Sequence, residues 1–192
     1  MKAYIAVVGK SGSGKETIYK MTCEIMGLRS DWPWQVSIHH FSDPLNEMLD
    51  LLYIECARPN QQKISTVLRQ AFGEELIGSV IYNRALKDSA DIVFLDGVRR
   101  PQDVTMLRRL PNSHLVCVEA VPEVRFERLK KRADRPGDAE KTWEQFLKEQ
   151  SAEAESMIDA IGREADFRID NSNDLESLRK QVREFLYIKL NL

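Results

Sequence analysis

Short apolar runs alternate along the chain with longer amphipathic stretches. The runs are Ala3–Val8, Val36–Phe41, Ile92–Leu95, His114–Val118 and Phe167–Ile169. The first four are rich in Val and Ile and end abruptly at polar residues or glycine, which is typical of strands buried on both faces. The fifth is short and has Arg168 at its centre. We therefore expect it at an edge of the sheet or at a strand end.

The amphipathic stretches between these runs predict helices. Their expected ranges are Lys15–Met26, Pro44–Ile54, Gln61–Lys87, Gln102–Leu107, Glu123–Arg132, Thr142–Ile161 and Leu175–Leu190. We expect the third stretch to break near Gly73 into two helices. The alternation of strands and helices predicts an α/β fold with a parallel sheet between helical layers. Its 192 residues are expected to form one domain, 1–192.

Composition and charge exclude several classes of protein. Lys and Arg number 28 and Asp and Glu 30, a net charge of -2, which argues against a protein that coats nucleic acid. The three cysteines are far apart and form no CxxC pair, so neither a zinc site nor a disulfide framework is expected. The first apolar run is too short for a signal peptide or a membrane span. We therefore expect a cytoplasmic protein that binds neither a membrane nor a nucleic acid polymer.

A glycine-rich loop follows the first predicted strand directly and opens the first predicted helix. Its residues fit the G-x-x-x-x-G-K pattern of a Walker A loop: Gly9, Lys10, Ser11, Gly12, Ser13, Gly14 and Lys15. The glycines let backbone N–H groups approach phosphate oxygens, and the helix N-terminus adds partial positive charge. Lys15 supplies a point charge for β- and γ-phosphates. The loop therefore predicts a polyphosphate site, whereas its glycine spacing does not fit a dinucleotide fingerprint.

The residue after Lys15 departs from this pattern, which has Ser or Thr there as a ligand of Mg²⁺. In this chain Glu16 follows, and then Thr17. A carboxylate can hold Mg²⁺ directly or through water. An outward-facing acid is also favoured in the first turn of a helix. Both interpretations of Glu16 stay open, and Thr17 is a second candidate for the metal.

A second motif combines an apolar strand with an acid at its end. Ile92–Leu95 leads into Asp96 and Gly97, a Walker B pattern, and Arg99 and Arg100 follow at once. The carboxyl ends of parallel strands meet at the edge of an open α/β sheet where ligands bind. Asp96 is therefore expected beside the glycine-rich loop.

A third motif is a row of arginines on the predicted helix 123–132. Arg128 and Arg132 are four residues apart and share a helix face, and Arg125 extends the row. The polar segment Arg132–Thr142, which contains Pro136 and Gly137, follows directly and is expected to be an exposed loop. The row is either a solvated charged face or a clamp for phosphate at the base of a lid.

Four segments occur in the order and approximate spacing seen in P-loop nucleotide kinases: GKSGSGK, FLDGVRRP, RFERLKKR and ADFRIDNSNDLESLRKQV. The last resembles the C-terminal strand and helix of dephospho-coenzyme A kinases, where this motif, here ending at Asn171, precedes a loop near the adenine. The third resembles the arginine pair of adenylate kinase. KET and FSDPL are similar to segments of phage-type deoxynucleoside monophosphate kinases. The resemblance is incomplete, because archaeal dephospho-coenzyme-A-kinase-like proteins carry an Arg-Asp pair near the place where this chain has Glu149 and Gln150.

The resemblance implies a three-layer P-loop NTPase fold with a five-stranded parallel sheet, a helical acceptor-binding insert over about 43–90 and a short lid over about 132–142. It implies ATP as phosphate donor and Mg²⁺ as cofactor. The catalytic residues would be Lys15, Asp96, Arg128 and Arg132. The nucleotide would be bound by residues 9–17, Arg128 and Asn171, and the metal by Glu16, Thr17 and Asp96.

The expected acceptor is a small phosphorylated molecule, a nucleoside or deoxynucleoside monophosphate before others. Arg69, Arg99 and Arg100 are candidates for its phosphate, because a guanidinium gives bidentate contacts. Asp43 could accept a proton from an acceptor hydroxyl or cap the helix that begins at Pro44. One alternative is a dephospho-coenzyme A kinase. Another is a nucleotide-binding regulatory module with little or no kinase activity. Two features suggest it: Glu16 after the Walker lysine, and the absence of an arginine near Glu149.

Overall fold

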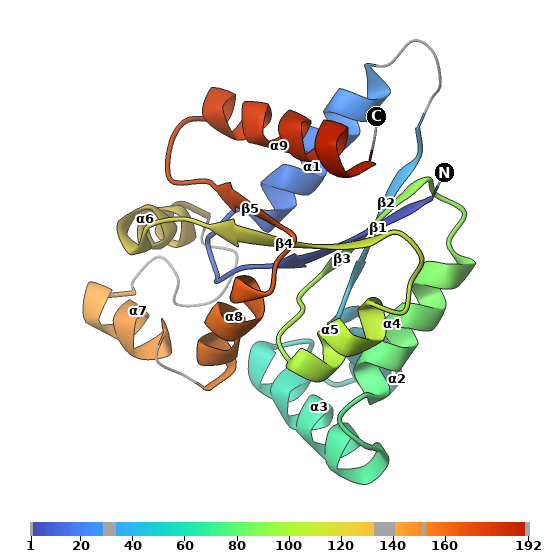
Figure 1. Cartoon of the computed structure of the whole chain (residues 1–192). Helices are drawn as coiled ribbons and strands as arrows, with labels where there is room; N and C mark the ends of the chain where they lie inside the picture. Colours follow the sequence, from blue (N-terminus) through green and yellow to red (C-terminus); the bar gives the residue numbers. More distant parts are fainter. Residues whose placement is uncertain (1, 29–33, 133–140, 151–152, 191–192) are drawn as a thin grey trace.

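The computed structural model describes residues 2–28, 34–132, 141–150 and 153–190. Its centre is a parallel sheet (Figure 1) of five strands in the order β2-β3-β1-β4-β5. The strands are β1 (Ala3–Val8), β2 (Val36–His40), β3 (Ile92–Asp96), β4 (Ser113–Glu119) and β5 (Phe167–Asp170). The predicted α/β class and five-stranded parallel sheet are thus confirmed.

Nine helices surround the sheet in the described part of the chain. They are α1 (Lys15–Gly27), α2 (Asp43–Leu51), α3 (Arg58–Phe72), α4 (Leu76–Lys87), α5 (Pro101–Leu107), α6 (Pro122–Arg132), α7 (Trp143–Gln150), α8 (Glu153–Arg163) and α9 (Leu175–Leu190). Helices α3 and α4 are separated at Gly73, whose φ of 98° favours glycine. The predicted break at this residue is confirmed.

Alternation of side chains along the strands produces three layers. Ile5 and Val7 of β1 pack with Ile18 of α1 and Leu178 of α9 on one face, because successive residues of a strand point to opposite faces. The other face of the sheet, which includes Ala6, packs against α4, α5 and α8. Figure 1 shows α1 and α9 on one side of the sheet and α4, α5 and α8 on the other.

Two sequence-based expectations about these elements are wrong. Strand β2 is half-buried along its length rather than buried on both faces, because it lies at the edge of the five-stranded sheet, beside β3. The stretch predicted as one helix, 142–161, contains two, α7 and α8. Phe146 of α7 packs on Phe126 of α6, whereas Ile158 of α8 packs in the core against the sheet. The two halves of the stretch therefore pack against different parts of the molecule. The short run at 167–170 is an edge strand, as expected.

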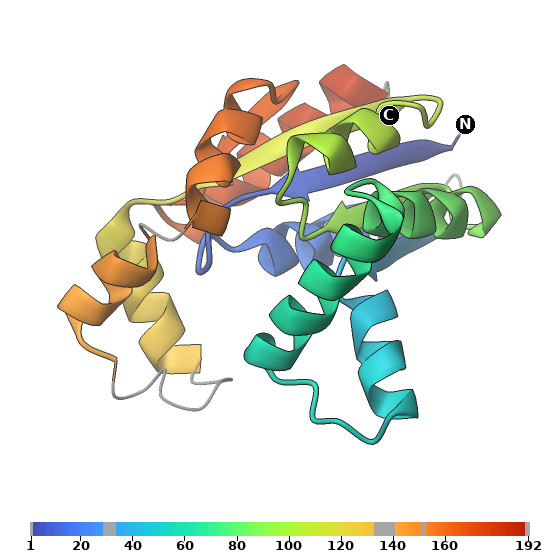
Figure 2. The same cartoon turned by 90° about the horizontal axis from the view of Figure 1, so that it is seen from below.

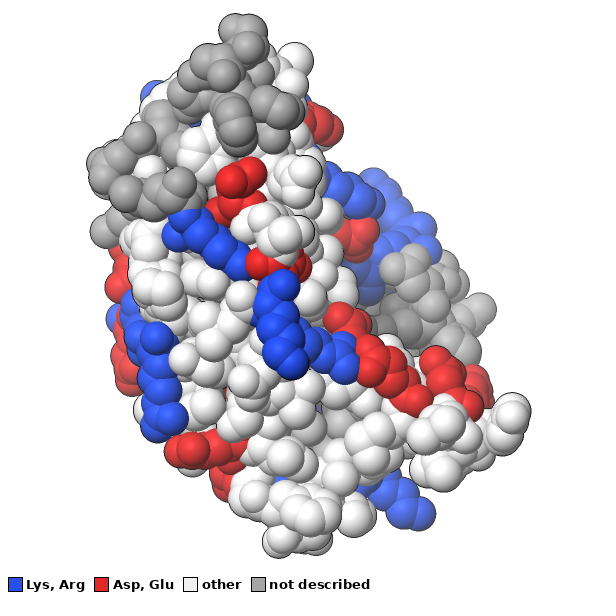
Figure 3. Space-filling view, turned by 90° about the vertical axis from the view of Figure 1, so that its right-hand side faces the viewer, with Lys and Arg blue, Asp and Glu red and all other residues white. Residues whose placement is uncertain are grey.

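Two pairs of helices extend from the same end of the sheet, α2 with α3 and α6 with α7 (Figure 2). The predicted insert, 43–90, contains α2, α3 and α4, whereas most of the predicted lid, 133–140, lies outside the described residues. On the face in Figure 3, basic and acidic side chains are interspersed. Within the described ranges, none of the helices is both long and apolar enough to cross a membrane.

Candidate phosphate-binding site

The glycine-rich loop joins β1 to α1 at the carboxyl edge of the sheet. Gly14 precedes the helix with a φ of 92°, a left-handed conformation that other residues rarely adopt. At Gly9 the constraint is space, because a Cβ there would lie 2.4 Å from the carbonyl oxygen of Val118. Because both conditions require glycine, the predicted Walker A segment forms a tight loop at the N-terminus of α1.

The Asn171 side chain holds this loop from behind. It is 3% exposed, its Nδ2 donates a hydrogen bond to the Ser13 carbonyl at 2.8 Å, and its Oδ1 accepts one from Arg128 at 3.3 Å. Any Cβ at Gly14 would collide with this amide. Asn171, predicted to contact the nucleotide, therefore lies beneath the loop and positions it.

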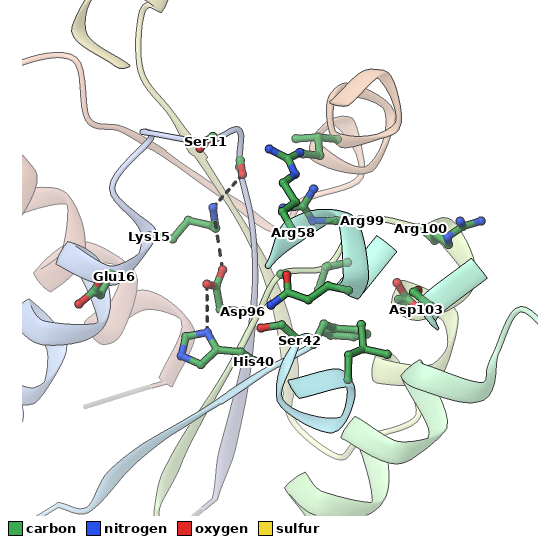
Figure 4. Close-up of a pocket in the computed structure, with 18 of the residues that line it drawn as sticks. Ser11, Lys15, Glu16, His40, Ser42, Arg58, Asp96, Arg99, Arg100 and Asp103 are labelled. Carbon is green, nitrogen blue, oxygen red and sulfur yellow. Dashed lines mark hydrogen bonds and ion pairs between the residues drawn. The ribbon is translucent and has the colours of Figure 1, made fainter. Parts of the chain in front are cut away.

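Lys15, Asp96 and His40 form a chain of contacts at the centre of the site (Figure 4). The Lys15 ammonium donates a hydrogen bond to the Gly9 carbonyl at 2.9 Å and lies 4.0 Å from Asp96 Oδ1. On the other side, Asp96 Oδ2 lies 3.3 Å from Nδ1 of His40, the last residue of β2. The strand order brings the carboxyl ends of β1, β2 and β3 together. The glycine-rich loop and the acidic end of β3 therefore lie side by side, as the sequence predicts.

These contacts shift two pKa values. Burial alone would raise the pKa of Asp96, but the hydrogen bond with His40 and the charge of Lys15 outweigh it, so the pKa lies below its ordinary range. The hydrogen bond with Asp96 raises the pKa of His40 despite the opposing effect of burial. Both shifts favour a charged Asp96 carboxylate at neutral pH.

The residues present fit a Mg²⁺ ion. Asp96 Oδ1 is buried and has no hydrogen-bond partner among the described residues. Thr17 and Asp96 both line the same cleft, and Mg²⁺ prefers carboxylate and other oxygen ligands combined with phosphate oxygens and water. No cluster of three or more His, Cys, Asp or Glu able to hold a metal occurs in the described ranges, so phosphate and water would have to complete the shell.

Glu16 faces away from this centre. Its carboxylate pairs with Lys20 at 2.7 Å, one helical turn further along α1, and that hydrogen bond is the main cause of its lowered pKa. The side chain is 62% exposed and points away from Asp96 in Figure 4. Of the two interpretations of Glu16, the geometry favours the outward-facing acid, although the residue still lines the edge of the cleft.

A cleft of about 1030 Å³ opens in front of the loop. Its far wall is helix α3, which contributes Arg58, Gln61, Gln62, Ser65, Thr66 and Arg69. Among these, only Arg69 was expected from the sequence, and His40 is a further residue of the site for which no role was predicted. The spacing of Arg58, Gln62, Ser65 and Arg69 by four, three and four positions is a polar helix face, a signal that the sequence contains.

The three candidate acceptor arginines line this cleft but differ in their surroundings. Arg69 is 6% exposed and its guanidinium lies 3.2 Å from the buried carboxylate of Asp103. Arg100 pairs with Glu74 at 2.8 Å and is more exposed. In Figure 4, Arg58 and Arg99 lie across the cleft from Lys15.

Of the arginines on α6, two line the cleft. Arg128 contacts Asn171, and burial lowers its pKa. Arg132 also borders the cleft. Arg125 instead is buried behind the loop, where it donates hydrogen bonds to the Ala120 carbonyl and the Gln150 side chain. The three arginines therefore do not form one row along the cleft. Arg128 and Arg132 line it, whereas Arg125 lies behind the loop.

Other predicted residues lie outside the cleft. Lys10 pairs with Asp159 at 2.7 Å beside a second pocket of about 390 Å³, so its side chain lies outside the main cleft. Ser13 is buried beside the same pocket, whereas Ser11 lines the main cleft. The Asp43 carboxylate accepts the backbone N–H of His40 at 2.7 Å. This contact ties α2 to β2, and α2 has no side-chain cap, which was one of the two roles expected of Asp43.

A glycine-rich loop at the carboxyl edge of a five-stranded parallel sheet defines a P-loop fold of the shikimate kinase type. The chain superimposes on shikimate kinase from Bacteroides thetaiotaomicron with a TM-score of 0.61 and 14% identity, covering 99% of both chains. The corresponding TM-score for shikimate kinase from Acinetobacter baumannii in complex with shikimate is 0.58, at 16% identity over 100% of this chain and 94% of that one. The predicted P-loop kinase fold is confirmed.

The chain belongs to the UPF0200 family. It is 30% identical over 187 residues to the UPF0200 protein of Thermococcus onnurineus, covering 95% of each chain. It is 28% identical over 182 residues to that of Hyperthermus butylicus, covering 95% of this chain and 92% of the relative. No protein-family model matches the chain. These matches support neither the dephospho-coenzyme A kinase nor the phage-type resemblance specifically.

Proposed function

We propose that the chain is an ATP-dependent phosphotransferase that moves the γ-phosphate of ATP to a small phosphorylated acceptor, a nucleoside or deoxynucleoside monophosphate before others. One observation carries the proposal. Within the described ranges, four buried side-chain atoms have no hydrogen-bond partner: Ser13 Oγ, Arg69 Nε, Asp96 Oδ1 and Arg128 Nη1. Buried polar atoms are nearly always paired. Three of the four belong to residues that line the cleft, Arg69, Asp96 and Arg128, whereas Ser13 lies in the loop beside the second pocket. Most of this unmet hydrogen-bonding capacity is therefore where substrates would bind.

The donor would lie along the glycine-rich loop. Backbone N–H groups and the N-terminus of α1 favour phosphate oxygens there, and Lys15 is within reach of the same place. Mg²⁺, held by Asp96 and Thr17, would neutralise charge on the β- and γ-phosphates. Arg128 and Arg132 border the loop from α6 and would add positive charge.

The acceptor would lie against α3 and the segment that follows β3. Arg58, Arg99 and Arg100 line that side, and a guanidinium pairs well with a phosphate group. The volume of about 1030 Å³ is at the upper end of the range for small-molecule sites, which is compatible with two substrates. Transfer requires only that both be held in line with their charges balanced.

An assay of ADP release across a panel of acceptors tests the proposal. The panel contains the common nucleoside and deoxynucleoside monophosphates, dephospho-coenzyme A, and shikimate as an unphosphorylated comparison. We expect a monophosphate to raise ADP release well above the rate with ATP alone. Stimulation by dephospho-coenzyme A alone would favour that alternative acceptor. If no acceptor raises the rate, the kinase proposal fails and a regulatory nucleotide-binding module becomes the better account.

Substitution of Lys15 tests the assignment of the loop. We expect Lys15→Ala to lower acceptor-dependent ADP release by at least about 100-fold, because a preorganised charge at the transferred phosphate is lost. Thermal unfolding checks that the fold persists, and Lys180→Ala, which removes an exposed lysine of α9 that does not line the cleft, is the control. Turnover like that of the unmodified protein in Lys15→Ala would contradict the proposed phosphate site.

A further inference from the structure

A carboxylate of the protein itself contacts two arginines that line the acceptor side of the cleft. Glu74 lies in the turn between α3 and α4, and its Oε2 is 2.8 Å from Arg100 Nη1 and 3.8 Å from Arg69 Nη1. Its side chain is 47% exposed. The Glu74 carboxylate therefore contacts Arg69 and Arg100, two of the three arginines that the sequence suggests for the acceptor phosphate.

The two arginines differ in their freedom to exchange this partner. Arg69 is buried and also binds Asp103 and the backbone carbonyl of Glu74, so it stays in place whatever the Glu74 side chain does. The side chain of Arg100 is 38% exposed and ends at Glu74. In Figure 4, the Arg100 guanidinium extends away from Lys15 and Asp96. The contact with Glu74 thus coincides with an orientation of Arg100 directed out of the transfer site.

We propose that Glu74 is the resting counter-ion of Arg100, and that binding of the acceptor exchanges this carboxylate for the acceptor's phosphate. The inference rests on the proposed function, because it assigns a competitor to the acceptor subsite of that reaction. A phosphate monoester carries more charge than a carboxylate and offers three acceptor oxygens, so it can displace Glu74. The exchange weakens binding of the phosphate by the free energy of the Glu74–Arg100 contact.

Several charged groups besides Glu74 and Arg100 border this region. Arg69 and Asp103 form the buried pair beneath it, and the backbone N–H of Arg99 also donates to Asp103. These contacts hold α3 against α5 without the Glu74 side chain. Two contacts that do not use the Glu74 side chain close the turn. The Arg69 guanidinium donates to the Glu74 carbonyl, and the Leu76 N–H donates to the Gly73 carbonyl. Replacement of the Glu74 carboxylate is therefore expected to leave the fold intact.

Glu74→Gln tests the proposal, with Glu75→Gln as the matched control because it removes the adjacent acid of the same turn. A partly exposed ion pair contributes up to roughly 1 kcal/mol, which corresponds to about a two- to fivefold change in affinity. We expect Glu74→Gln to lower the KM for the monophosphate acceptor by that factor with kcat unchanged. The affinity for the dephosphorylated form of the acceptor should not change, because that molecule has no phosphate group to bind Arg100. An unchanged or raised KM would overturn the proposal.

A second measurement does not depend on turnover. In the Lys15→Ala background, which weakens phosphate binding at the loop, inorganic phosphate is titrated and followed by NMR. We expect about two- to fivefold tighter binding when Glu74→Gln is added and none of this gain with Glu75→Gln. Equal or weaker phosphate binding would overturn the role of Glu74. If instead the acceptor panel shows no transfer while this gain is seen, the proposed function fails and the anion exchange stands.

A double-mutant cycle ties the effect to Arg100. We expect Glu74→Gln to change the acceptor KM by less than about 1.5-fold in an Arg100→Gln background, because the two residues act through one contact. A full two- to fivefold effect of Glu74→Gln in the absence of the Arg100 guanidinium would overturn the proposal. It would mean that Glu74 acts through the general field of the cleft.

Discussion

Asn171 shows how one side chain can fix the geometry of a binding loop. Its amide joins the Ser13 carbonyl in the loop to the Arg128 guanidinium on α6, and its own backbone N–H donates to the Glu119 carbonyl at the end of β4. These contacts link the ends of β4 and β5 to the loop after β1. Asn171 can therefore influence how the backbone N–H groups of the loop are oriented.

We expect Asn171→Ala to weaken both stability and nucleotide binding. The substitution leaves the buried Ser13 carbonyl without its donor, at a cost of about 1–3 kcal/mol in the free energy of unfolding. The KM for ATP should rise as the loop loses its support. Urea unfolding and steady-state kinetics measure the two effects, with Asn173→Ala in the following turn as the control. An unchanged KM for ATP would contradict the positioning role.

Sequence reasoning finds some of these residues and misses others for a physical reason. Lys15 and Asp96 carry their signal in their immediate neighbours, a glycine-rich loop and an apolar strand. His40 and Glu74 have no such local signal, because each becomes significant only through a partner far along the chain. The C-terminal motif predicts a place near the nucleotide for Asn171. It gives no sign of the hydrogen bond from this side chain to Ser13, which spans 158 positions.

At the scale of elements, Asp166 joins three segments that the sequence separates. Its carboxylate accepts a bidentate pair of hydrogen bonds from Arg108, just after α5, and the backbone N–H of Leu115 in β4 at 2.7 Å, while it leads into β5 itself. Burial alone would raise the pKa of Asp166. The hydrogen bonds from Arg108 and Leu115 outweigh burial and hold the pKa below its ordinary range.

This pKa shift predicts how stability depends on pH. A carboxyl group whose pKa is lower in the folded state stabilises the fold fully above its ordinary pKa of 3.8, and the effect disappears as pH falls through the folded-state pKa. We expect Asp166→Asn to lower the free energy of unfolding by about 1 kcal/mol at pH 7, since solvent screens the partly exposed pair. The difference in the free energy of unfolding between the variant and the unmodified protein should become smaller below about pH 4.

Urea unfolding at pH 7 and in the acid range measures this difference, and Glu164→Gln nearby controls for the loss of a negative charge. A difference in the free energy of unfolding that stays constant on acidification would contradict the assigned pKa shift.

The elements themselves were largely predictable, because apolar runs and amphipathic periods are local. The edge position of β2 and the separation of α7 from α8 were not, since both depend on which surfaces meet in the folded chain.

At the scale of the whole molecule, the strand order places the carboxyl ends of β1, β2 and β3 side by side. The loop after β1, Asp96 on β3 and His40 on β2 meet there, and two helical arms extend from the same end of the sheet (Figure 2). The net charge of -2 gives no sign of this arrangement. Despite this overall balance, the cleft is lined by two lysines, Lys15 and Lys20, and by six arginines: Arg58, Arg69, Arg99, Arg100, Arg128 and Arg132.

The fate of the γ-phosphate tests the central claim most directly. The protein is incubated with Mg²⁺, ATP labelled at the γ-phosphate, and the acceptor that most stimulates ADP release, and the labelled products are separated. Our account predicts that the label appears in the acceptor, and that Lys15→Ala abolishes this transfer. Label found only in inorganic phosphate, at the same rate with and without acceptor, would contradict the assignment of the cleft as a site of phosphoryl transfer.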